Sequence, residues 1–241
     1  MSSLPRLEVN ELPAASKDET SATASPARGR EMKQNLLSKL RAPPLVHAWD
    51  FWHDRQDRKP TSTSTSGETT DATSETKYED RLLHLSAIAD VKAFWSTFNN
   101  FDITALPLRD SVHLFHRGVK PVWEDPRNTK GGSWTFRVPK DKAPEFWKEV
   151  CMMAIGEQLQ AAVESKRITF RDDICGVSLS VRFNSILVQI WNRDAEHKEG
   201  VDKILKTVLE GLPDELKPRD GSYYYKKHAE HAGFTLGERA M

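Results

Sequence analysis

"ICGVSLSVRFNSILVQIWNRD", residues 174–194, decides the fold class of this 241-residue chain. Its first half alternates between apolar side chains at 177, 179, 181 and 183 and polar side chains at 178, 180 and 182. A period of two is typical of a β-strand, and the Asn-Ser pair at 184–185 indicates a short connection to a second strand. The stretch therefore predicts an antiparallel strand pair.

Outward from this pair, strand and helix patterns succeed each other along the chain. Helices are expected at 91–100, with Asp90 as N-cap, at 143–160, entered through Pro144, and at about 200–210, capped by Gly211. Strands are expected within 45–53, 77–88, 111–125, 131–139 and 222–227. Because neighbouring strands lie close in sequence, we expect an α+β fold. It would contain a curved antiparallel sheet of about eight strands with three helices packed on one face.

Composition divides the chain into one folded domain and polar segments. We expect a disordered tail at 1–40, a domain at 41–229 and a C-terminal tail at 230–241. Within the domain, a Ser/Thr-rich stretch predicts a mobile loop at 55–77, and a charged insert covers 160–173. The loop is either a solvated spacer or a phosphorylation site, and the spacer is the more common case.

Charge and residue counts exclude several functional classes. The 35 basic and 35 acidic residues leave no strong positive field, so any contact with RNA must be local and specific. No apolar run has the length of a membrane span. We interpret Cys151 and Cys175 as reduced core residues. Both observations indicate a protein of the cytoplasm or nucleus. The common motifs of nucleotide hydrolysis, dinucleotide binding and hydrolase catalysis are absent. We therefore expect no enzyme and no cofactor.

The histidine pairs do not predict a metal site. His113 and His116 are three residues apart on an expected strand and point to opposite faces, so they cannot share a metal. His228 and His231 have the same spacing in a polar tail, where solvent exposure is the more common case.

A ligand site is suggested by "KPVWEDPRNTKGGSW", residues 120–134. Packing alone explains poorly why Trp123 directly precedes an acid in a loop bounded by prolines. Together with Tyr78, Trp123 could enclose a flat base, and a 7-methylated guanine would add cation–π attraction and a base edge that Glu124 can bind. The alternative is that Trp123 is a hydrophobic plug and Glu124 an ordinary loop acid.

The sequence resembles the cap-binding translation initiation factor 4E family from about residue 43 to residue 228. The most specific matches are "LFHRGVKPVWEDPRN", "GGSWTF" and "DDICGVSLSVRF" followed by "IW". The resemblance implies a curved sheet with the helices on its convex face, and binding of the 7-methylguanosine cap of mRNA.

By the same resemblance, five residues would form the cap site. Tyr78 and Trp123 would stack on the base, Glu124 would bind its edge, Trp191 would contact the methyl group and Arg182 the phosphates. Tyr78 stands where the initiation-type members have Trp, which is similar to the class II, 4E-homologous branch.

Two basic positions of the initiation-type members are lost in this chain, which has Ser133 and Leu187 there. Phosphate binding would then depend mainly on Arg182, helped by Lys226 or Lys227 if the C-terminal strand closes over the site. Weaker cap binding with a shallow salt dependence is the expected consequence.

A second surface, which we call the dorsal surface, follows from residues that share helix faces. Val91 and Trp95 lie four residues apart on one expected helix. The resemblance implies that they form a docking surface for helical Tyr-x4-Leu-Φ peptides of scaffold or repressor proteins, together with Pro44, Leu45, Glu149, Met152 and Gly156. Trp95 could equally be a core residue, which is the more common role for a tryptophan on a helix.

Three functional hypotheses remain at this point. The first is a monomeric, non-catalytic cap-binding protein that acts in translation initiation or its repression. The second is a protein-interaction module of the same fold with weak or vestigial cap binding, which works through the dorsal surface. The third, a cap-processing enzyme, is disfavoured because no catalytic dyad or acidic helix of the Nudix type is found in the sequence.

Overall fold

The computed structural model describes residues 30–31, 33–34, 42–56, 81–163, 173–232 and 234. The chain divides into two units, residues 1–42 and 43–241. In the first unit, residues 30, 31, 33 and 34 are helical and exposed. The second unit contains the sheet with the helices α2 to α5.

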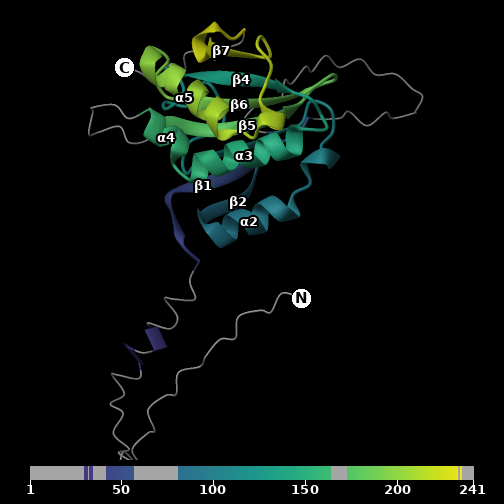
Figure 1. The fold of residues 1–241 in the computed structure, drawn as a ribbon. Coiled ribbons are helices and arrows are strands. Elements are labelled where there is room, and N and C mark those ends of the chain that lie inside the picture. The colour runs from purple at the N-terminus through teal and green to yellow at the C-terminus, as the bar shows by residue number, and fades with distance from the viewer. Residues whose placement is uncertain are drawn as a thin grey trace, which may run out of the picture. The chain divides into compact units, whose positions relative to one another are not determined.

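Strands and helices alternate through the second unit (Figure 1). The strands are β1 (Pro44–Asp54), β2 (Leu82–Asp90), β3 (Ser111–His116), β4 (Gly132–Val138), β5 (Ile174–Val181), β6 (Ile186–Asn192) and β7 (Tyr223–Lys227). The α-helices are α2 (Val91–Asn100), α3 (Ala143–Ile155), α4 (Gln158–Ala162) and α5 (Lys198–Gly211). The short 3-10 helices with described bounds are η2 (Ile103–Ala105), η3 (Asp214–Leu216) and η4 (His228–Glu230).

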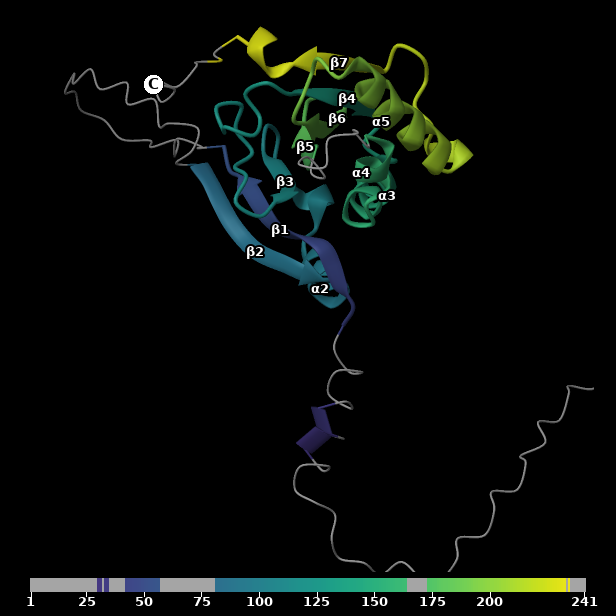
Figure 2. The ribbon, with the colours of Figure 1, turned by 90° about the vertical axis from the view of Figure 1, so that its left-hand side faces the viewer.

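The seven described strands form one antiparallel sheet in the order β2-β1-β3-β5-β6-β4-β7. The expected pair at 174–194 is β5 and β6, which join the β2-β1-β3 half of the sheet to the β4-β7 half. Figure 2 shows that this sheet is strongly curved, with α3, α4 and α5 on its convex side. The concave side is left for the loops that connect the strands.

The main core lies between the convex side of the sheet and the helices. Its largest fully buried side chains include Trp49 from β1, Phe136 from β4 and Trp147 from α3. The indole N–H of Trp134 in β4 donates to the carbonyl of Val201 at 2.8 Å, which fixes α5 against the sheet. None of the described helices is both long and apolar enough to cross a membrane.

The α+β class and the antiparallel sheet are confirmed, with small differences in number. Seven strands are described where about eight were expected. Helix α2 has the expected limits, and the side chain of its N-cap Asp90 accepts the N–H of Ala93 at 2.7 Å.

The helix expected over 143–160 is divided into α3 and α4, so the described residues of the second unit contain four α-helices where three were expected. The division falls at Gly156, the C-cap of α3, and at Glu157, whose φ is 62°. The apolar periodicity continues across this break, which is why the sequence pattern does not indicate it.

Two strand ends differ from the expected ones. Strand β3 ends at His116, because Gly118 turns the chain with a φ of 82°. Strand β5 ends at Val181, so Phe183 belongs to the turn and is 78% exposed. The prediction that Phe183 continues the buried apolar face was therefore wrong.

The end of helix α5 also differs from the expected one. Gly211 was expected to cap the helix, but it is the last residue of α5, and the C-cap is Leu212.

Candidate functional site

Two polar residues, Asp125 and Asn128, hold the backbone of the loop between β3 and β4. The carboxylate of Asp125 accepts the backbone N–H groups of Lys120, at 3.0 Å, and of Arg127, at 2.9 Å. The side-chain amide of Asn128 is buried and donates to the carbonyls of Lys120 and Val122. Asp125 and Asn128 therefore give the loop its shape, as residues that bond their own neighbouring backbone commonly do.

The glycine pair that ends this loop is required by close packing. A Cβ atom at Gly131 would lie 2.0 Å from the backbone oxygen of Asn192, and one at Gly132 would lie 2.4 Å from the hydroxyl of Tyr225. No side chain fits at these distances. The pair brings the start of β4 against β6 and β7, so it serves the fold and not a phosphate.

Trp123 and Glu124 are the residues of the motif that the loop's own bonds leave available. Both are half-buried, and the Glu124 carboxylate makes no hydrogen bond or ion pair within the described residues. Trp123 packs on a small apolar cluster on the sheet that contains Trp191. Asp125 is thus the acid that shapes the loop, and Glu124 makes none of the loop's structural hydrogen bonds.

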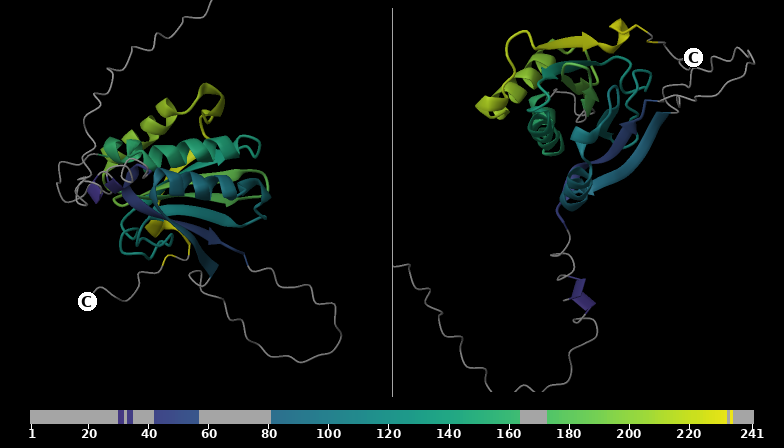
Figure 3. Two further views of the ribbon diagram at one scale, coloured as in Figure 1. Left: turned by 90° about the horizontal axis from the view of Figure 1, so that it is seen from below. Right: turned by 90° about the vertical axis from the view of Figure 1, so that its right-hand side faces the viewer.

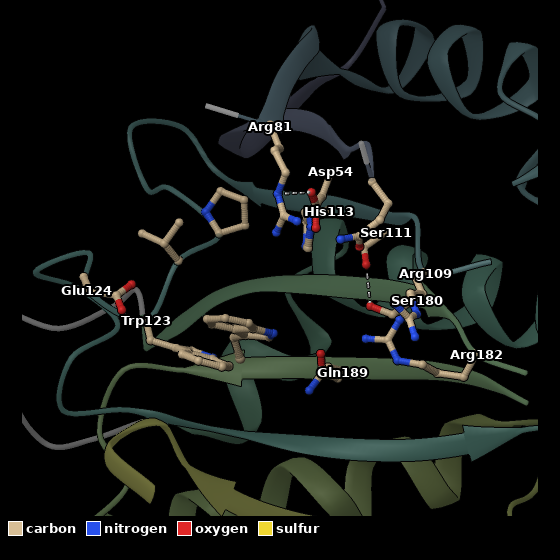
Figure 4. A pocket seen from close by; sticks show the side chains of 14 residues that line it. Asp54, Arg81, Arg109, Ser111, His113, Trp123, Glu124, Ser180, Arg182 and Gln189 are labelled. Atoms are coloured by element: carbon tan, nitrogen blue, oxygen red, sulfur yellow. Dashed lines mark hydrogen bonds and ion pairs between the residues drawn. The ribbon is translucent and has the colours of Figure 1, made fainter. Parts of the chain in front are cut away.

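A cavity of about 530 Å³ is lined by four of the five expected cap-site residues, all but Tyr78 (Figure 4). Trp123 and Glu124 lie at one end of it and Arg109 and Arg182 at the other. Trp191, whose cluster Trp123 packs against, also lines the cavity. A cavity of this size, with aromatic walls and a few polar groups, is typical of a small-molecule site.

A histidine from the C-terminal segment stacks on Trp123. The ring centroids of Trp123 and His231 lie 4.4 Å apart with an interplanar angle of 16°. His228 of η4 packs against Trp191 at 4.3 Å. Neither histidine lines the cavity. Burial lowers the pKa of His228 to about 3, and burial, together with the charge of Lys226, lowers the pKa of His231. Both rings are therefore neutral at pH 7 and pack on the two tryptophans as uncharged aromatic partners. The expectation of exposure was wrong for His228, which is fully buried.

Two buried polar pairs join β3 and β5 beside the cavity, which Ser111, His113 and Ser180 line. The hydroxyls of Ser111 and Ser180 are 2.8 Å apart, and Nδ1 of His113 is 2.7 Å from the hydroxyl of Ser178. His113 is 3% exposed, and its Nε2 has no hydrogen-bond partner in the described part of the chain. Burial, with a smaller effect of the charge of His53, lowers the pKa of His113 to about 3, so the ring is neutral at pH 7.

This histidine predicts that acid destabilises the protein. Below pH 6.5 the unfolded chain binds a proton at His113 and the folded chain does not. The contribution of this residue to the free energy of unfolding is therefore fully present above pH 6.5 and is lost progressively as the pH is lowered toward 3. Between pH 7 and pH 5 this one group lowers the free energy of unfolding by about 2 kcal/mol. Urea unfolding at both pH values should show that the loss is smaller by this amount in His113→Asn. An equal loss in both proteins would contradict the assignment.

The basic end of the cavity contains two arginines. Arg182 follows β5, and its Nη1 donates to the carbonyl of Val181 at 3.0 Å. Arg109 precedes β3 and was not recognised in the sequence. Lys226 and Lys227 do not line the cavity, and Lys227 is bonded to Glu196. Ser133 is buried in β4, and Leu187 is half-buried in β6.

The remaining expectations have mixed outcomes. Tyr78 lies outside the described residues, as do residues 57–77 of the expected loop and 164–172 of the charged insert. The described parts of the chain contain no group of three or more His, Cys, Asp or Glu side chains placed to hold a metal. Cys151 and Cys175 are both buried, and neither belongs to a disulfide in the described part of the chain.

The dorsal residues come from three elements. Pro44 pairs with Asp90 at the start of β1, and the N–H of Val91 donates to the carbonyl of Pro43 at 3.0 Å, so the chain before β1 adjoins the start of α2. Helix α2 packs on β2, and α3 packs on β1 and β5. Figure 3 shows both helices on the same side of the sheet. Leu45, Val91, Trp95, Glu149 and Met152 are half-buried, while Pro44 and Gly156 are exposed. Trp95 packs on Phe94 and Phe98 and is neither fully core nor fully exposed.

Comparisons with known proteins identify the family. Residues 44–239 match the family described as "Eukaryotic initiation factor 4E". The chain is 31% identical to the Oryza sativa eukaryotic translation initiation factor NCBP over 219 residues, 90% of this chain and 82% of that protein. It is 26% identical to the Homo sapiens eukaryotic translation initiation factor 4E, over 91% of this chain and 94% of that one.

Among solved structures, C. elegans eIF4E-3, in a complex with the 4E-binding protein Mextli and a cap analog, has a TM-score of 0.62 and 27% identity. The match covers 78% of this chain and 94% of that one. Ascaris suum eIF4E-3 with an m2,2,7G cap has a TM-score of 0.61 and 26% identity, over 81% of this chain and 96% of that one. The chain therefore belongs to the eukaryotic initiation factor 4E family.

Proposed function

We propose that this protein binds the 7-methylguanosine cap of mRNA without catalysis and acts in translation initiation or its repression. The observation that carries the proposal is the joint position of Trp123 and Glu124 in one cavity, with the Glu124 carboxylate unengaged within the described residues. Cap ligands in the solved structures of related eIF4E-3 proteins support it.

The chemistry of the base site follows from the charge of the methylated ring. The positive charge of 7-methylguanine strengthens stacking on the Trp123 indole and acidifies the N–H groups at the edge of the base. Glu124 would accept these groups in charge-assisted hydrogen bonds. Trp191 would contact the methyl group, and Tyr78 would supply the second stacking face.

Phosphates would bind at the other end of the cavity. Arg182 lines that end, and a guanidinium can bind two phosphate oxygens at once. With Ser133 and Leu187 in place of basic residues, the positive charge there is smaller than in the initiation-type members. A dissociation constant in the micromolar range, or about −8 kcal/mol, is therefore expected.

The test is quenching of tryptophan fluorescence during titration with 7-methyl-GTP, with unmethylated GTP as the control ligand. Stacking on Trp123 should quench its emission, and methylation should increase affinity at least about tenfold because only the methylated ring is charged. Equal affinity for the two nucleotides would contradict cap recognition.

We propose in addition that the dorsal surface binds a helical peptide of the Tyr-x4-Leu-Φ type. Trp95 of α2 and Met152 of α3 are half-buried apolar side chains, and Glu149 lies three residues before Met152 on the same helix, where it pairs with Lys148 at 4.0 Å. Apolar side chains with a nearby carboxylate suit an amphipathic helix. The complexes of C. elegans eIF4E-3 with Mextli support a protein partner for this family. If cap affinity proves negligible, this surface would carry the function by itself.

A further inference from the structure

Arg109 has an unusual backbone conformation beside the cavity. Its φ is 75°, and among the described residues other than glycine only Glu157 also has a positive φ. For an arginine, this left-handed backbone conformation costs on the order of 1 kcal/mol. It persists only where the surrounding structure imposes it. Strained residues of this type are concentrated at ligand sites, so this position invites a functional explanation.

Backbone hydrogen bonds impose the conformation. The N–H of Arg109 donates to the carbonyl of Val181 at 3.0 Å, and the N–H of Val181 donates to the carbonyl of Asp110 at 3.0 Å. The carbonyl of Val181 also accepts Nη1 of Arg182. One carbonyl at the end of β5 thus holds the backbone of one arginine and the side chain of the other.

Both arginine side chains consequently lie at the same end of the cavity, as Figure 4 shows. The guanidinium of Arg109 makes no hydrogen bond or ion pair with the rest of the described residues. The neighbouring carboxylate of Asp110 is already engaged by Nε2 of His53, at 3.0 Å, and by the N–H of Gln56, at 3.2 Å. Arg81, the third arginine of the lining, lies 3.6 Å from Asp54.

Two guanidinium groups side by side repel each other, and an anion bound between them removes this repulsion. We infer that Arg109 is a second phosphate-binding residue, which together with Arg182 clamps the phosphate chain of the cap nucleotide. This inference rests on the proposed cap binding. It supplies from the loop before β3 a positive charge that Ser133 in β4 and Leu187 in β6 do not provide.

The clamp changes the expected salt dependence. With Arg182 alone, the dissociation constant would depend only weakly on salt. With two arginines in contact with phosphate, the slope of log Kd against log salt concentration should be steeper by about one unit. Phosphate number should matter as well, because Trp123 and the two arginines lie at opposite ends of the cavity, and a triphosphate extends farther from the base than a monophosphate does.

Arg109→Gly is the informative variant, because glycine adopts a positive φ without strain and the loop should stay folded. Arg219→Gly is the matched control, since it removes one exposed arginine that does not line the cavity. Dissociation constants for 7-methyl-GMP and 7-methyl-GTP should be measured by tryptophan fluorescence between about 50 and 300 mM KCl. Urea unfolding checks that both variants are folded.

For Arg109→Gly we expect about tenfold weaker binding of 7-methyl-GTP, little change for 7-methyl-GMP and a salt slope shallower by about one. Arg219→Gly should bind both ligands like the unaltered protein. Unchanged 7-methyl-GTP affinity and slope in Arg109→Gly would overturn the clamp and leave cap binding intact. If the unaltered protein does not prefer methylated nucleotides, cap binding itself fails, and the clamp with it.

Discussion

Glu124→Ala is expected to weaken binding of 7-methyl-GTP at least about 100-fold while the protein stays folded. The carboxylate would accept two charge-assisted hydrogen bonds from the guanine edge, each worth about 1.5–3 kcal/mol. Its removal would leave the donors of the base unpaired in a partly enclosed site. The free protein should lose little stability, because Glu124 has no partner among the described residues. Fluorescence titration and urea unfolding measure the two quantities separately.

Asp125→Ala is the matched control, since it removes the next carboxylate along the chain. Asp125 holds the N–H groups of Lys120 and Arg127, so its loss should lower the free energy of unfolding by about 1–3 kcal/mol. Glu124→Ala should lower it by less than about 0.5 kcal/mol. If Glu124→Ala binds 7-methyl-GTP like the unaltered protein, Glu124 does not read the base, whatever the control shows.

This contrast between adjacent acids also indicates what the sequence can and cannot predict. The motif around Trp123 predicted a ligand site in which Glu124 is the acid, but it did not indicate that Asp125 shapes the loop. That role depends on the positions of two backbone N–H groups, which follow from the path of the loop. The strand pair at 174–194 was predictable because alternation is local and needs no knowledge of distant residues.

Residues that act through distant contacts were missed for the same reason. His113 was considered only as half of a metal pair, whereas its partner is Ser178, 65 residues away and set by the register of β3 on β5. Arg109 stands in an irregular connection without any period, and its φ of 75° depends on hydrogen bonds to Val181. The pattern of apolar residues carries no signal for either one.

Trp95→Ala should weaken binding of a Tyr-x4-Leu-Φ helical peptide at least about 30-fold, because a half-buried tryptophan at the centre of an interface is typically worth 2 kcal/mol or more. Trp95 is on α2, and α2 packs on β2, whereas the cavity lies among β3, β5 and the loop before β4. The affinity for 7-methyl-GTP should therefore stay within about twofold of the original value. Calorimetry with the peptide and fluorescence with the nucleotide test the two surfaces independently.

Lys92→Ala provides the control for this surface, since it changes an exposed residue of the same helix. It should leave peptide binding nearly unchanged, because an exposed side chain contributes little to an interface that it does not enter. Trp95 also packs on Phe94 and Phe98, so its removal costs some stability, and a thermal melt must show that the variant is folded at the assay temperature. Full peptide affinity in a folded Trp95→Ala would make Trp95 a packing residue and move any partner to another face. If Trp95→Ala weakens the binding of both the peptide and 7-methyl-GTP, the substitution disturbs the whole sheet. Only a loss of peptide affinity with unchanged nucleotide affinity identifies Trp95 as part of a docking surface.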